Sequence, residues 1–77
     1  VSEEKLTMAD LKKGDAAVVT AIHTRHRERL KKILAMGLLP DTKLRLIRNF
    51  PSFIFEIGYS RFAVDGKIAK DVIVSRL

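Results

Sequence analysis

The sequence predicts a mainly β fold, a small antiparallel barrel of about five short strands with one amphipathic α-helix. Short segments rich in β-branched and aromatic residues alternate with turn residues, and a single longer segment has helical spacing. The chain has 77 residues, of which 47% are hydrophobic, so we expect residues 1–77 to form one domain. A closed or nearly closed barrel is the economical arrangement, because closure hides unpaired strand edges.

The first half of the chain contains the predicted helix. Thr7 to Asp10 fits the Ser/Thr-x-x-Asp/Glu pattern of a helix start and is expected to form one turn. The β-branched stretch Ala16 to Ile22 predicts a strand. A helix is predicted from about Thr24, as its N-cap, to Met36. Its apolar positions fall on one stripe expected to face the core, namely Leu30, Ile33 and Leu34.

The second half begins where this helix ends. Gly37 is expected in the left-handed conformation, with Leu38 packing back and Pro40 stopping the helix. Alternating apolar residues then predict strands with one buried face, and a helical turn is expected at Lys67 to Asp71. The strand residues are Leu44 and Leu46, then Phe53, Phe55 and Ile57, then Phe62 and Val64, and last Val72 to Val74.

The residues from Met36 to Pro40, with the sequence Met-Gly-Leu-Leu-Pro, resemble the Met-Gly-Leu-x-Pro-Gly signature of FeoA proteins. The similarity extends from about Leu6 to Val74, and it implies an SH3-like barrel, a fold also seen at the C-terminus of DtxR-type repressors. Asp41 stands where the family usually has Gly, which puts the turn geometry in question. The motif residues have structural explanations and no reactive chemistry: Met36, Gly37, Leu38, Pro40, Gly58 and Ala63.

The resemblance implies a non-enzymatic accessory or regulatory module of bacterial ferrous iron uptake. Its implied partner is the cytosolic part of FeoB, the membrane transporter for Fe(II). The chain has no Cys, and it shows no glycine-rich phosphate loop and no evident His partner for a serine, so we expect no enzyme activity and no cofactor. The apolar runs are too short for a spanning helix and no export signal is evident, so a cytoplasmic location is expected.

A basic cluster lies between Arg25 and Lys32, and it contributes to the net charge of +6. One reading is a solvated helix face. A second reading is a face that docks on an acidic protein surface through Arg25, Arg29 and Lys32. The alternative function is a nucleic-acid-binding barrel that uses this cluster, although only Tyr59 and Phe50 remain free for stacking on bases.

Two histidines, His23 and His26, are the only residues that suggest a metal site. A protein metal site usually has three or four ligands, and no Cys or third His completes this one. The simpler interpretation is structural, with His23 ending a strand and His26 packing at the start of the helix.

Overall fold

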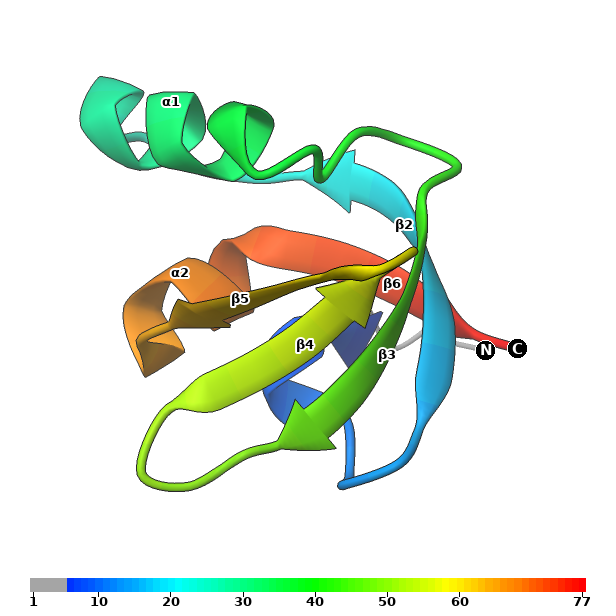
Figure 1. Ribbon diagram of the computed structural model, residues 1–77. Coiled ribbons are helices and arrows are strands. Elements are labelled where there is room, and N and C mark those ends of the chain that lie inside the picture. Colours follow the sequence, from blue (N-terminus) through cyan, green and yellow to red (C-terminus); the bar gives the residue numbers. More distant parts are fainter. Residues whose placement is uncertain (1–5) are drawn as a thin grey trace, which may run out of the picture.

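The computed structural model describes residues 6–77, which form one antiparallel sheet with three short helical segments (Figure 1). The six strands are arranged in the order β1-β6-β2-β3-β4-β5. Their bounds are β1 Leu6–Thr7, β2 Ala16–Ile22, β3 Lys43–Arg48, β4 Phe53–Ile57, β5 Ser60–Val64 and β6 Val72–Arg76. The helices are the 3₁₀ turn η1 Met8–Asp10, α1 Arg27–Ala35 and α2 Gly66–Asp71.

The sheet curls around its core and leaves strands β1 and β5 as its two edges (Figure 1). Helix α2 follows β5 and contacts both η1 and β1 on the other side of the opening. The mainly β class with an amphipathic helix is confirmed. The expected number of strands is corrected to six, because Leu6–Thr7 adds to β6, and α2 is a second helix of six residues.

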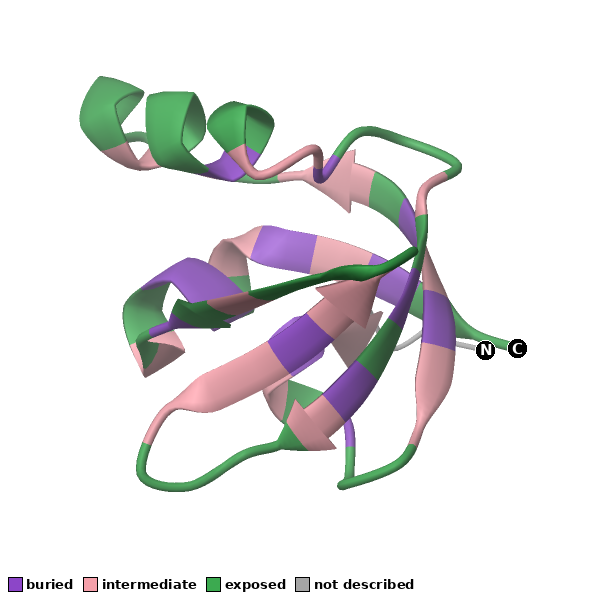
Figure 2. Cartoon of the chain, in the orientation of Figure 1, coloured by how far each residue is buried: buried purple, intermediate pink, exposed green. Residues whose placement is uncertain are grey.

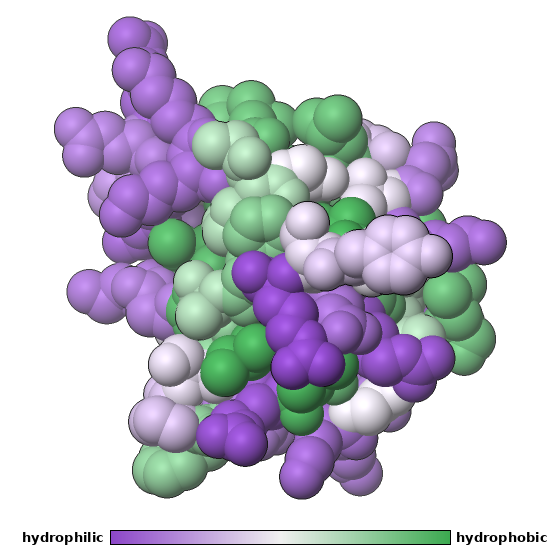
Figure 3. Space-filling view, in the orientation of Figure 1, coloured by the Kyte–Doolittle hydropathy of each residue, from purple (hydrophilic) through white to green (hydrophobic). Residues whose placement is uncertain are grey.

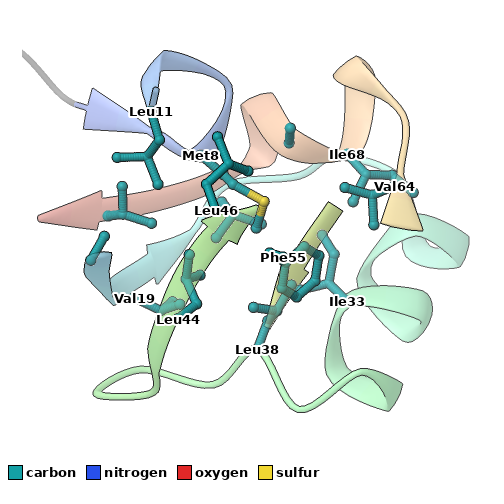
Figure 4. Packing of buried hydrophobic residues seen from close by; sticks show 14 residues of the cluster. Met8, Leu11, Val19, Ile33, Leu38, Leu44, Leu46, Phe55, Val64 and Ile68 are labelled. Carbon is teal, nitrogen blue, oxygen red and sulfur yellow. The ribbon is translucent and has the colours of Figure 1, made fainter. Parts of the chain in front are cut away.

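The core contains only hydrophobic side chains among residues 6–77 (Figures 2 and 4). Phe55 lies at its centre, and its ring centroid is 5.7 Å from that of Phe62. Figure 4 shows Ile33 of α1 pointing toward Phe55. Alternation along the strands is confirmed, since Leu44, Leu46, Val64, Val72 and Val74 are buried.

Strand β3 contains an irregularity near its end. The pairing register between β3 and β4 shifts between Leu46 and Arg48, so Ile47 is the extra residue of a bulge. A bulge changes the side on which later side chains point, which is why the alternation breaks at Ile47.

The turn after α1 takes the geometry that a glycine would take. Asp41 has a φ of 74°, in the left-handed region where Asp is tolerated better than most residues. Its N–H donates to the carbonyl of Val19 at 2.7 Å, and the N–H of Val19 donates to the carbonyl of Thr42 at 2.8 Å. The replacement of the family's usual Gly by Asp41 therefore preserves a turn that is tied to strand β2.

Candidate partner-binding surface

Helix α1 begins later than the sequence predicted. Thr24 does not cap the helix; its Oγ1 accepts a hydrogen bond from the N–H of His26 at 3.1 Å. His26 is the N-cap residue, with an extended backbone and no side-chain hydrogen bond, and its carbonyl accepts the first helical bond from Leu30 at 3.0 Å. The predicted start at Thr24 was wrong because Thr24 to His26 form a local turn that holds the backbone extended.

The end of α1 is firmly specified. Gly37 has a φ of 85°, and its N–H donates to the carbonyl of Leu34 at 3.0 Å, while the N–H of Leu38 donates to Ile33 at 3.2 Å. These two bonds form a Schellman motif, which satisfies carbonyls that the helix leaves free. Leu38 is fully buried, as expected. The motif Met36 to Pro40 therefore ends the helix and anchors it to the barrel.

The apolar stripe of α1 is only partly buried, which corrects the expectation that all three residues belong to the core. Ile33 is the one buried residue of the helix, whereas Leu30 is 36% and Leu34 is 44% exposed. Leu39, just beyond the helix, is 50% exposed. Figure 2 shows most of α1 coloured as exposed, and the three leucines are among the exposed large hydrophobic residues.

Basic side chains predominate on the rest of α1 and in the residues before it, with Glu28 as the one acidic residue of the helix. Arg25, Arg27, Lys31 and Lys32 are exposed, and Figure 3 shows hydrophilic side chains projecting where α1 lies in Figure 1. Arg29 differs, because its guanidinium lies 3.5 Å from the carboxylate of Asp71 at the end of α2. Arg29 therefore joins the two helices, while the other cations are available to a partner.

A groove of about 390 Å³ runs between α1 and the β5–α2 segment. Its lining is mostly apolar, and the charged residues Lys32 and Asp65 lie on opposite walls. The carboxylate of Asp65 accepts the N–H of Ile68 at 2.9 Å as the N-cap of α2. The lining residues are Lys32 and Ala35 from α1 with Met36 just after it, and Ala63, Val64, Asp65 and Ile68 from the opposite wall. We call α1, its exposed leucines and this groove the α1 surface.

The two histidines lie in the segment between β2 and α1, and both are exposed. The backbone N–H of His23 donates to the carbonyl of Asp71 at 2.8 Å, which fixes the end of β2 against α2. Within residues 6–77 no three His, Cys, Asp or Glu side chains come together as a set of metal ligands. His23 directly follows β2, whereas the exposed His26 takes the N-cap position of α1 without the packing that was expected of it.

The exposed aromatic residues do not form one platform. Phe50 is 79% exposed in the loop before β4, and Tyr59 is fully exposed in the turn after it. The length of β4 separates them by about 17 Å at the usual rise per residue. Successive bases stack on neighbouring rings, so this arrangement favours a protein partner over a nucleic acid.

Sequence reasoning found the basic cluster but missed the groove and the exposed leucines. The groove joins α1 to β5 and α2, which are far apart in sequence, so no local pattern predicts it. The exposure of the leucines could have been expected from the length of the helix. Helix α1 has only nine residues, and five cations lie within it or just before it. So short and so charged a helix has little room to bury three apolar side chains in a small core.

The sequence model of the FeoA domain matches residues 6–76. No curated protein sequence matches the chain. Among solved structures, an iron uptake regulatory protein (FeoA) is 25% identical with a TM-score of 0.86, over 97% of this chain and 100% of that one. Among residues 6–77 no helix is long and apolar enough to cross a membrane.

Two further structures share the fold. FeoA from Stenotrophomonas maltophilia in complex with zinc, a procaryotic SH3 domain protein, is 22% identical with a TM-score of 0.80, over 91% of this chain and 89% of that one. A manganese-dependent transcriptional repressor in complex with manganese is 19% identical with a TM-score of 0.86, over 99% of this chain but 38% of the repressor. These likenesses confirm the SH3-like fold. With the domain match along nearly all of its length, the chain belongs to the FeoA family.

Proposed function

We propose that this chain is a non-enzymatic accessory protein of bacterial ferrous iron uptake, which acts as a single cytoplasmic domain. Its partner is the cytosolic part of a FeoB-type transporter, and the contact is made by the α1 surface. Family membership supports the process, since relatives are described as an iron uptake regulatory protein and as a proposed ferrous iron transport activating factor.

The observation that carries the proposed contact is the half-exposed stripe of α1. Leu30 and Leu34 keep apolar surface in water although the helix has a spacing suited to burial. Apolar groups surrounded by charge are the usual anatomy of an interface, with an apolar centre and a polar rim. Here Arg25, Lys31 and Lys32 provide the rim. The cations would speed the encounter with an acidic surface, and the leucines would supply contact area.

The experiment compares two triple variants that remove the same amount of positive charge. The first, the α1 variant, changes Arg25→Glu just before α1 and Lys31→Glu and Lys32→Glu within it. The control changes Lys12→Glu, Lys43→Glu and Lys70→Glu, three exposed lysines outside α1. Arg29 is kept in both, although it belongs to the predicted contact, because reversing it would place two carboxylates together at Asp71.

Binding is measured as the association rate with the purified cytosolic region of a FeoB-type transporter at several salt concentrations. At low salt the α1 variant should associate about tenfold more slowly or worse, with a weaker dependence on salt, while the control stays close to the parent. Equal losses in the two variants would mean that net charge, and not α1, governs the encounter. Parental rates in the α1 variant would exclude this surface.

Nucleic-acid binding is the second candidate, favoured by the net charge of +6 and the cluster from Arg25 to Lys32. A titration with mixed oligonucleotides at increasing salt distinguishes it, since phosphate contacts impose a steep salt dependence. We expect no saturable binding at physiological salt. Tight binding that is lost in the α1 variant would instead make the oligonucleotide the ligand of the α1 surface.

A further inference from the structure

Strand β5 has a free edge. In the sheet formed by residues 6–77 it pairs only with β4, and its other side has no neighbouring strand. Such an edge presents a row of backbone donors and acceptors that can pair with another chain.

The hairpin turn determines which groups point outward. Ile57 and Ser60 pair across the two-residue turn that contains Gly58, whose φ of 59° suits the first central position of a type II′ turn. Hydrogen-bonded pairs then alternate with non-bonded pairs along the hairpin. Ser60, Phe62 and Val64 consequently bond to β4, while Arg61 and Ala63 direct their N–H and C=O groups away from it. No backbone hydrogen bond joins Arg61 or Ala63 to another segment within residues 6–77.

The outward groups border the groove described above. Ala63 lines that groove together with Val64, and Ala35 at the end of α1 and the following Met36 line the α1 wall. The groove volume of about 390 Å³ is within the usual range of binding pockets, about 300–1,000 Å³. A strand that bonded to Ala63 would thus lie between β5 and α1, with alternate side chains directed into an apolar space.

Charge indicates which side chains the added strand carries. Lys32 lies on the α1 wall. Arg61 flanks Ala63 on the edge itself, where its guanidinium pairs with the carboxylate of Glu56 in β4 at 2.9 Å. Asp65, the acidic residue of the lining, already accepts a hydrogen bond from the backbone of α2. Within residues 6–77 Lys32 and the neighbouring Lys31 form no ion pair, so the charge that α1 presents beside the groove is positive. This suits carboxylates at the positions of the added strand that point out of the groove.

We propose that the β5 edge binds partners by strand addition. The ligand is an extended protein segment in which apolar residues alternate with Asp or Glu, and it pairs with Arg61 and Ala63 while its apolar residues enter the groove beside α1. This inference deepens the proposed function by naming the class of segment that a protein partner would present.

The probe is a blocked synthetic peptide of about seven residues with alternating glutamate and valine, a length suited to one strand. Its binding to the full chain is followed by the amide signals and hydrogen exchange of the protein. The amides of Arg61 and Ala63 should become protected when peptide is added, whereas those of Phe62 and Val64 should be protected from the start. A matched peptide with N-methylated valines keeps the side chains but loses backbone donors, and it should bind about tenfold more weakly or worse.

The protein variant that tests the edge is Ala63→Pro, which removes an outward N–H but no bond to β4. Ala63→Ser is its control, because it retains the N–H at the same position. We expect Ala63→Pro to lose about tenfold or more in peptide affinity and Ala63→Ser to bind like the parent. If Ala63→Pro fails to fold, the exchange pattern of the parent and the N-methylated peptide decide the question.

Three results would overturn strand addition. They are an absence of saturable binding, equal affinity for the two peptides, and protection confined to amides of α1. Protection of Arg61 and Ala63 that rises with protein concentration alone would also overturn it, because the edge would then pair with a second copy of this chain. The two proposals fail separately: loss of transporter binding in the α1 variant but not in Ala63→Pro would retain the α1 contact and exclude the edge.

Discussion

Helix α1 has nine residues and helix α2 has six, but the shorter helix is held more closely by the barrel. Helix α2 buries Ile68 and Ala69 and has a capped first turn, since the side chain of Asp65 accepts the N–H of Ile68. Helix α1 buries only Ile33, and no side chain caps its start. Helix α2 therefore completes the barrel, whereas α1 is an attached arm whose spare apolar surface is available to a partner.

The largest expected effect tests the one buried side chain of α1. Ile33→Ala should lower the free energy of unfolding by about 2–5 kcal/mol, because the side chain is fully buried beside Phe55. Leu34→Ala, one position along the same helix, should cost about 1 kcal/mol or less, since the leucine is 44% exposed. Urea unfolding of both variants measures the difference. Similar losses would mean that Leu34 is buried as well and that α1 lies closer to the barrel.

The end of α1 is the second attachment, and Gly37 is the position that tests it. Gly37→Val should destabilise the fold by about 1–2 kcal/mol, because a β-branched residue is strained in the left-handed region. Gly37→Asn should cost less, since Asn visits this region more readily. A Cβ at this position would meet no other atom within 4 Å, so the backbone conformation alone is responsible. Thermal melts showing equal losses for Val and Asn would argue against this cause.

Much of the fold could be predicted from local patterns. Strand β2 has the predicted bounds, Gly37 takes the predicted left-handed conformation, and residues 67–71 lie in the predicted helical turn. These features depend on neighbouring residues and on backbone preferences that a sequence displays directly. Strand β1 was missed because two residues carry no periodicity, and their pairing with β6 depends on residues at the other end of the chain.

The candidate site was only partly predictable. Lys32 lies on the exposed face of α1, as predicted, whereas Arg25 is exposed in the segment before the helix. Whether they contact a partner stays a prediction. The stripe of Leu30, Ile33 and Leu34 shows that a helix can face an apolar surface, but not which surface. The ion pair of Arg29 with Asp71, 42 residues apart, could not be read from helical spacing.

A smaller effect compares the starts of the two helices. Asp65→Ala should cost about 1 kcal/mol, because the N–H of Ile68 loses its side-chain acceptor. His26→Ala, at the equivalent position of α1, should change stability very little, as its side chain forms no cap hydrogen bond. Chemical denaturation of the two variants side by side provides the measurement. A larger loss for His26→Ala would show that the start of α1 is held by a contact of the imidazole.

The smallest effect uses a carboxylate outside both helices as a reference. The carboxylate of Asp15 accepts the N–H of Lys12 at 2.8 Å and lies 3.3 Å from Nε of Arg76. The backbone hydrogen bond from Lys12, with a further contribution from Arg76, lowers the pKa of Asp15 below its ordinary value of 3.8. A carboxyl with a lower pKa in the folded chain stabilises the fold fully above its unfolded-state pKa, and this contribution disappears as the pH falls through the folded-state pKa.

The stability difference between the parent and Asp15→Asn should therefore be constant near neutral pH and shrink below about pH 4. Denaturant unfolding at a series of pH values measures this difference. Hydrogen exchange in acid should show faster exchange of the amides of β2 and β6 than of α1, because Arg76 and Asp15 join the end of β6 to the loop before β2. A difference that stays constant down to about pH 3 would show that the ion pair and hydrogen bond do not favour the charged carboxyl.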